Sequence, residues 1–200
     1  MNKLITVVGA SGVGKTTLVN ALARTGMFTT ALEQHTERPF QSLFKKNKRF
    51  ALANQVDYLL LRAEQEKLLR AADQIGLMDG GLDLDFHGFT RLFHNRGLLT
   101  DPEFDLCLRL YSLFRALLPP PDLIILLSAP QGIITQRLAT RSRINIASAK
   151  DAETIDHFIR EWLESVPQNK IMRLNAVDED ENYPVTTRRI LDWVTANNPA

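Results

Sequence analysis

The chain has 200 residues, of which 44% are hydrophobic, and its 24 Lys and Arg against 23 Asp and Glu give a formal net charge of +1. This composition is typical of a globular protein and excludes extensive disorder. The charge balance argues against a protein that coats nucleic acid, because such proteins carry a strong basic excess. The single cysteine, Cys107, excludes an internal disulfide.

Targeting signals are not visible in the sequence. The longest apolar stretch, at 123–127, is far too short to cross a bilayer. The first residues lack the charged, apolar and cleavage regions of a signal peptide. We therefore expect a cytoplasmic protein without a membrane partner, folded as a single domain over residues 1–200.

Strands and helices are expected to alternate along the chain. In chain order we expect a strand at 4–8, a helix at 15–24, a strand at 28–32, a helix at 52–72, a short apolar run at 75–78, helices at 83–95 and 102–118, a strand at 123–127, helices at 130–141 and 151–166, a strand at 171–174 and a helix at 183–196. This alternation predicts an α/β fold, with a parallel sheet of about five strands flanked by helices.

The loop after the first strand carries the strongest motif. Residues 9–16, GASGVGKT, fit the pattern G-x-x-x-x-G-K-[ST] and stand between a predicted buried strand and a predicted helix. Glycines let backbone N–H groups point at phosphate oxygens, and the lysine and hydroxyl reach the terminal phosphates and Mg²⁺. The expected ATP-binding residues are Gly9, Ala10, Ser11, Gly12, Val13, Gly14, Lys15, Thr16 and Thr17.

Other classes of P-loop protein fit less well. The letters D-x-x-G occur at 85–88, but at the start of a helical pattern, and no N-K-x-D guanine motif is present. A motor-type ATPase needs an apolar strand that ends in a carboxylate, whereas the strand at 123–127 is followed by Ser128. The run that ends at Asp79 is a weaker candidate for such a strand.

A polar segment at about 137–150 is a candidate lid over the phosphates. Arg137 and Arg141 share one helical face, and Arg143 follows just past the helix end. The planar guanidinium matches phosphoryl oxygens and is always charged, so these side chains suit phosphoryl transfer to a small acceptor. A solvated basic helix end is the alternative interpretation.

Further polar residues are spaced in a recognisable way. Glu33 follows the second strand, Gln55 and Arg62 lie seven residues apart on one predicted helix, and Asp85 and Phe89 lie four apart on another. Each spacing allows its two side chains to share a helical face. With the phosphate loop and the arginines, this order resembles the deoxynucleoside kinases, from the loop to about residue 143.

The resemblance implies roles for these residues. Glu33 is similar to the catalytic carboxylate that deprotonates the 5′-hydroxyl and helps to order Mg²⁺. Gln55, Arg62, Asp85 and Phe89 resemble the groups that bind the base. A second set takes up phosphate charge and metal: Lys15, Arg137, Arg141 and Arg143 for the transferred phosphoryl group, and Thr16, Glu33 and Asp79 for Mg²⁺.

The chain departs from the family pattern at several positions. Gly80 and Gly81 stand where the Asp/Glu-Arg-Ser signature has its Arg and Ser. Phe44 stands where a substrate-binding Tyr is usual, and Ile146 where a Glu pairs with that Tyr on the sugar 3′-hydroxyl. Either another basic group such as Arg38 replaces the signature arginine, or the kinase activity is weakened or altered.

The sequence thus predicts an ATP- and Mg²⁺-dependent phosphotransferase for a small-molecule acceptor, a deoxynucleoside according to the resemblance. One alternative is a P-loop kinase for a nucleoside monophosphate, whose phosphate would bind the basic residues Arg38, Lys45, Lys46, Lys48 and Arg49. Another is a nucleotide-binding regulatory protein with little kinase activity. The resemblance also implies that the helices at 52–72 and 102–118 build a homodimer interface.

Overall fold

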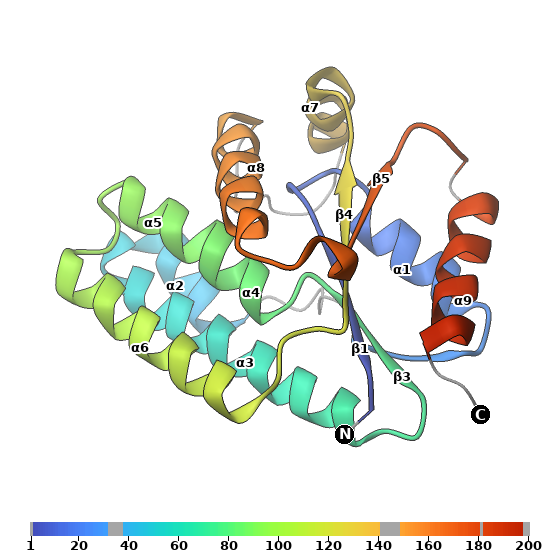
Figure 1. The fold of residues 1–200 in the computed structure, drawn as a ribbon. Helices are drawn as coiled ribbons and strands as arrows, with labels where there is room; N and C mark the ends of the chain where they lie inside the picture. Colours follow the sequence, from blue (N-terminus) through green and yellow to red (C-terminus); the bar gives the residue numbers. More distant parts are fainter. Residues whose placement is uncertain (1, 32–37, 141–148, 181, 198–200) are drawn as a thin grey trace.

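A five-stranded parallel sheet runs through the protein (Figure 1). The structure is a computed structural model that describes residues 2–31, 38–140, 149–180 and 182–197. The strands lie in the order β2-β3-β1-β4-β5. They are β1 (Leu4–Val8), β2 (Phe28–Ala31), β3 (Ile75–Asp79), β4 (Leu123–Ser128) and β5 (Ile171–Asn175).

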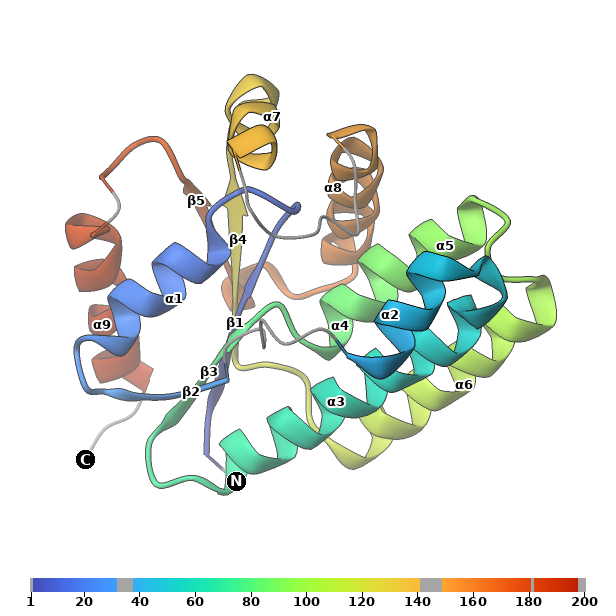
Figure 2. The same cartoon turned by 180° about the vertical axis from the view of Figure 1, so that it is seen from behind.

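Helices cover both faces of the sheet (Figures 1 and 2). They are α1 (Lys15–Ala23), α2 (Pro39–Lys46), α3 (Ala51–Ala71), α4 (Leu82–Leu84), α5 (Arg91–Asn95), α6 (Asp101–Leu117), α7 (Gln131–Thr140), α8 (Ala149–Glu164) and α9 (Pro184–Asn197). Short 3-10 turns span Lys48–Phe50 and Gln168–Lys170. A π-helical segment, η2 (Asp85–Thr90), joins α4 to α5.

The core is divided by the sheet because side chains alternate along each strand. Ile5 and Ile125 face α1 and α9, and they pack there with residues such as Ile190. Ile124, the neighbour of Ile125, faces the other way and packs with Ile155 of α8. Burial on both faces explains why the strands read as continuous apolar runs rather than as alternating patterns.

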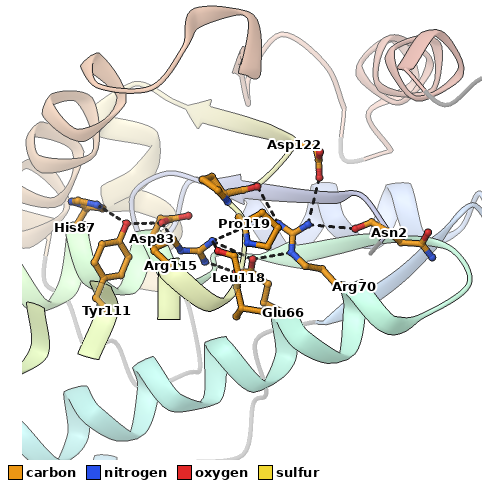
Figure 3. A network of polar contacts seen from close by, with 11 residues as sticks. Asn2, Glu66, Arg70, Asp83, His87, Tyr111, Arg115, Leu118, Pro119 and Asp122 are labelled. Atoms are coloured by element: carbon orange, nitrogen blue, oxygen red, sulfur yellow. Dashed lines mark hydrogen bonds and ion pairs between the residues drawn. The ribbon is translucent and has the colours of Figure 1, made fainter. Parts of the chain in front are cut away.

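A buried polar network ties the far ends of α3 and α6 to the sheet (Figure 3). Glu66 accepts hydrogen bonds from Arg70 Nε at 3.1 Å and from Arg115 Nη1 at 3.2 Å. Arg115 Nε also lies 3.2 Å from an oxygen of Asp83. Arg70 in turn donates to the carbonyl of Pro119, at 2.7 Å, in the turn before β4. The network thus fixes the helical layer that carries η2 against the sheet.

The predicted α/β class and the parallel five-stranded sheet are confirmed. The apolar run expected at 75–78 is the buried strand β3, and it continues to Asp79. Two features were not expected. Helix α2 occupies 39–46, and the helix expected at 83–95 is interrupted by the π-helical turn of η2. Among the described helices, none combines the length and the apolarity that spanning a membrane requires.

Candidate active site

The phosphate-binding loop connects β1 to α1 at the carboxyl edge of the sheet. Gly9 has φ 148°, and a Cβ there would lie 2.3 Å from the carbonyl oxygen of Leu127, so only glycine fits at this position. Lys15, the first residue of α1, donates from Nζ to the carbonyls of Gly9 at 3.0 Å and Ala10 at 3.1 Å. The lysine therefore lies across the loop whose backbone amides would receive phosphate.

Thr16 and Asp79 meet beside this loop. The Thr16 hydroxyl donates to Asp79 Oδ2 at 2.6 Å. Asp79 is 1% exposed, and its Oδ1 has no hydrogen-bond partner among the described residues. β1 and β3 are parallel neighbours, which brings the end of β3 next to the loop that follows β1. A buried carboxylate oxygen beside a hydroxyl is a donor set that suits Mg²⁺.

The candidate lid is represented by α7. Arg137 Nη1 donates to the carbonyl of Val13 at 2.7 Å, so this arginine contacts the phosphate loop. The predicted lid residues Arg141 and Arg143 lie outside the described residues, as does Ile146. The predicted catalytic carboxylate Glu33 lies outside them too.

Three of the predicted base-binding side chains are buried together between α3 and η2. Arg62 Nε pairs with Asp85 Oδ2 at 2.7 Å, and their side chains are 3% and 8% exposed. Gln55, two turns earlier on the same face of α3, is 3% exposed, and its Oε1 lies 3.0 Å from the hydroxyl of Thr90. The same hydroxyl lies 3.1 Å from the carbonyl of Asp85. One connected set of polar groups therefore joins both elements.

Thr90 is the member of this set that sequence reasoning missed. On a regular α-helix the neighbour of Asp85 is Phe89, four residues on, which was the expected arrangement. In the π-helical turn, the hydroxyl of Thr90 bonds to the backbone carbonyl of Asp85, five residues earlier. Thr90 therefore lies next to Asp85 where an α-helix would place Phe89. Phe89 is half-buried and packs against the apolar cluster under α8, which includes Leu92 and Trp162. A single sequence offers no signal for a π-turn.

Phe44 and the basic residues around it have other partners. Phe44, from α2, is buried and stacks on Phe93 with ring centroids 4.9 Å apart. Lys48 Nζ lies 4.0 Å above the Phe44 ring. Arg38 Nε donates to Asp57 at 2.5 Å. Arg38, the suggested substitute for the signature arginine, is thus held by a carboxylate of α3.

The position of the missing signature arginine has an unusual backbone. Gly80 has φ 81°, a left-handed conformation that side chains other than glycine rarely adopt. A Cβ at this position would lie 3.4 Å from Arg62 Nη2. The guanidinium of Arg62 therefore lies beside the residue that follows Asp79, and brings the predicted base-binding residues next to the end of β3.

Two known kinases are similar to the chain in sequence. In sequence the chain is 29% identical to the deoxyadenosine/deoxycytidine kinase of Bacillus subtilis over 149 residues, which are 71% of this chain and 67% of that protein. It is 26% identical to the deoxyadenosine kinase of Dictyostelium discoideum over 140 residues, 70% of this chain and 57% of that protein.

Solved structures show the same fold. The deoxyadenosine kinase of M. mycoides with bound dATP superposes with a TM-score of 0.76 at 18% identity, covering 96% of this chain and 99% of that one. The same enzyme with the products dCMP and dCDP gives a TM-score of 0.75 at 19% identity over the same shares of the two chains. The deoxynucleoside kinase family model matches residues 5–195, from β1 to α9. The chain therefore belongs to the deoxynucleoside kinase family.

Proposed function

We propose that this protein transfers the γ-phosphoryl group of ATP to the 5′-hydroxyl of a deoxynucleoside. The observation that carries the proposal is that the end of β3 leads from the phosphate loop to the buried residues predicted to bind the base. Asp79 pairs with Thr16 of the phosphate loop, and six residues later Asp85 pairs with Arg62 in the buried base-binding set. The phosphate-binding loop and the buried pair of Arg62 and Asp85 thus lie at the two ends of one short segment, which begins at the end of β3.

The donor phosphates would bind the loop and the first turn of α1. Backbone N–H groups of the loop and the N-terminal end of α1 favour anions. Lys15 would leave the loop carbonyls to neutralise the β- and γ-phosphates. Arg137, which already bonds the loop at Val13, would be joined by Arg141 and Arg143 as the lid closes and excludes water.

Mg²⁺ would be held by Thr16 and Asp79, with Glu33 as a further carboxylate. The unpartnered Oδ1 of Asp79 supports this assignment, because a buried carboxylate oxygen without a donor calls for a cation or a proton. When bound, the ion supplies charge neutralisation at the phosphoryl oxygens. The chain's own part is to orient the Asp79 carboxylate through the hydroxyl of Thr16.

The acceptor would place its base between Gln55, Arg62 and Asp85, and its 5′-hydroxyl near Glu33. As the general base, Glu33 would accept the hydroxyl proton while the oxygen attacks the γ-phosphorus, and ADP would leave. Deoxyadenosine and deoxycytidine are the acceptors we propose, from the names of the two sequence relatives. Glu33→Gln is expected to abolish turnover and to leave ATP binding near normal.

The test is a panel assay with γ-labelled ATP and Mg²⁺. The acceptors are the four deoxynucleosides, the four ribonucleosides and the nucleoside monophosphates, and products are separated by charge. The proposal expects label on deoxyadenosine and deoxycytidine. Label on monophosphates alone would overturn it in favour of a monophosphate kinase, and no labelled acceptor with intact ATP binding would indicate a regulatory protein.

We further propose that the protein acts as a homodimer through α3 and α6. These helices pack side by side (Figure 1) and expose a set of leucines. The exposed members are Leu60, Leu68, Leu106, Leu108, Leu113 and Leu117. Leu113→Lys is expected to give a monomer by light scattering, whereas Val185→Lys, on an exposed part of α9, is expected to leave the dimer intact.

A further inference from the structure

Thr90 holds a buried hydroxyl between two oxygen atoms. It is 0% exposed, and its Oγ1 lies 3.0 Å from Gln55 Oε1 and 3.1 Å from the carbonyl oxygen of Asp85. A threonine hydroxyl has one proton to donate, so it cannot satisfy both acceptors. For both contacts to be hydrogen bonds, one of the two partners must therefore donate to Thr90 Oγ1.

Only the Gln55 contact can change. The carbonyl of Asp85 is a backbone group and accepts in every arrangement. The Gln55 side-chain amide, in contrast, can turn by 180° and exchange its oxygen for its nitrogen, because oxygen and nitrogen have nearly the same shape. If the Thr90 proton goes to Asp85, the turned amide donates to Thr90 Oγ1. The contact with Gln55 and the contact with the Asp85 carbonyl are then both hydrogen bonds, each with its own proton.

In this arrangement the Gln55 amide oxygen points away from Thr90 and can accept from a ligand, while the amide nitrogen keeps one further N–H. Among the described residues, Thr90 is the only hydrogen-bond partner of the Gln55 side chain. With its nitrogen bound to Thr90, Gln55 therefore presents its oxygen to the base-binding set. The neighbouring Asp85 carboxylate is also an acceptor, while the Arg62 guanidinium is the donor of the set.

We infer that Thr90 is a specificity-determining residue, whose single hydroxyl proton fixes Gln55 with its amide oxygen toward the nucleobase. This inference rests on the proposed function and deepens it. An acceptor oxygen at Gln55 selects bases with an exocyclic amino group, which are adenine and cytosine. The same oxygen disfavours guanine and thymine, because these bases present a carbonyl oxygen at the corresponding position. The two oxygens would then face each other without a proton between them.

The experiment measures binding rather than turnover. Calorimetry without ATP gives the affinities of deoxyadenosine, deoxycytidine, deoxyguanosine and thymidine for the wild type and for Thr90→Val, which keeps the shape and removes the hydroxyl. We expect the preference for amino bases over keto bases to fall about tenfold in Thr90→Val. Thr90→Ser, which restores the proton, is expected to recover it. Thr90→Ala replaces the valine variant if the latter does not fold.

Thr195→Val is the matched control. Its hydroxyl also donates to the carbonyl of a preceding helical turn, that of Leu191 at 3.0 Å, but in α9 on the other side of the sheet (Figure 1). This control is expected to leave the affinity ratio unchanged. An unchanged ratio in folded Thr90→Val, or a wild type that prefers keto bases, overturns the role of Thr90.

The two proposals fail in different ways. A wild type that binds amino bases through Thr90 but transfers no phosphoryl group from ATP supports the Thr90 assignment and overturns the proposed function. A wild type that phosphorylates deoxynucleosides with a base preference independent of Thr90 supports the proposed function and overturns the Thr90 assignment. A wild type that binds none of the four deoxynucleosides overturns both.

Discussion

Thr16 and Asp79 are 63 positions apart in sequence, and in the structure their side chains share a hydrogen bond of 2.6 Å. The contact exists because β1 and β3 are neighbours and end at the same edge of the sheet. It joins the phosphate loop to the strand that leads into the base-binding residues. The proposed chemistry depends on this junction, and so do several predictions.

Asp79→Asn tests the charge at the junction. Asparagine keeps the shape of the side chain and can still accept from Thr16, so the fold is expected to be preserved. The lost negative charge is expected to lower kcat by about 100-fold and to weaken the Mg²⁺ dependence of ATP binding. Steady-state kinetics across Mg²⁺ concentrations measure both effects. Asp105→Asn, at an exposed position of α6, is the control, and equal kinetics in the two variants would remove Asp79 from the metal site.

Gly80→Ala tests the close approach of Arg62. The left-handed φ of 81° is expected to cost about 1–2 kcal/mol of folding stability. The added methyl group would lie in van der Waals contact with Arg62 Nη2, at 3.4 Å. A backbone shift that relieves the strained φ would move residue 80 relative to Arg62, so the KM for the deoxynucleoside is expected to rise several-fold. Gly97→Ala separates the two effects, because Gly97 has φ 65° and nothing within 4 Å of a new Cβ. A normal KM in Gly80→Ala would contradict the coupling of residue 80 to the acceptor site through Arg62.

The sugar 3′-hydroxyl offers a test that needs no variant. Phe44 and Ile146 replace the two residues that contact this hydroxyl in the family pattern, and Phe44 is packed on Phe93 instead. A hydrogen bond to a charged group contributes about 1.5–3 kcal/mol, which this chain would not gain. We therefore expect 2′,3′-dideoxyadenosine and deoxyadenosine to have kcat/KM values within about fivefold of each other. A hundredfold preference for deoxyadenosine would reveal an undetected 3′-hydroxyl contact.

Glu66→Ala tests the buried network of Figure 3. Glu66 is 1% exposed and accepts from Arg70 and Arg115, so its removal takes away the buried carboxylate that these two largely buried guanidiniums share. The expected loss of unfolding free energy is about 3–5 kcal/mol, measured by denaturant unfolding. Asp156→Ala breaks the exposed pair with Arg160 and is expected to cost less than about 1 kcal/mol. Similar losses in both variants would contradict the structural role of the network.

His87 is expected to make the protein less stable in acid. Its Nε2 lies 3.1 Å from the Tyr111 hydroxyl, and burial, followed by the nearby Arg91 and Arg115, lowers its pKa from 6.5 to about 4. Between these values the unfolded chain binds a proton that the folded chain does not. The unfolding free energy therefore rises with pH from about 4 to 6.5, by at most about 3 kcal/mol from this residue.

The measurement compares the wild type with His87→Gln, whose amide can still donate to Tyr111. Unfolding free energies are determined at pH 4.5, 5.5 and 7.5. The difference between the two proteins isolates His87 from the other titrating groups. A difference that does not change with pH would show that His87 does not titrate in this way.

The phosphate loop could be predicted because its residues are consecutive and each has a chemical reason to be there. The pairing of Thr16 with Asp79 could not be predicted from the sequence, because it depends on the order of the strands in the sheet. The apolar run before Asp79 was visible, but its place beside β1 was not. Helix α2 was missed although Pro39 stands at its start and Phe40 and Leu43 follow at helical spacing.

The sequence indicated that Gln55, Arg62 and Asp85 would lie close together, which the structure shows, but not how they are arranged. Gln55 and Arg62 share a face of α3 because seven residues make two helical turns, and the sequence contains that relation directly. The π-turn between Asp85 and Thr90 changes the neighbour of Asp85 by one position, and no residue type announces it. Its consequence, a hydroxyl placed between Gln55 and the Asp85 carbonyl, becomes visible only in three dimensions.

The most direct test of the account is phosphoryl transfer itself, with a pair of acceptors that differ at one atom. Purified protein is incubated with γ-labelled ATP, Mg²⁺ and either deoxyadenosine or 2′,5′-dideoxyadenosine, which lacks the attacking hydroxyl. The account predicts labelled deoxyadenosine 5′-monophosphate from the first and no labelled nucleoside from the second. Label on neither acceptor, in a protein that binds both ATP and deoxyadenosine, would contradict it.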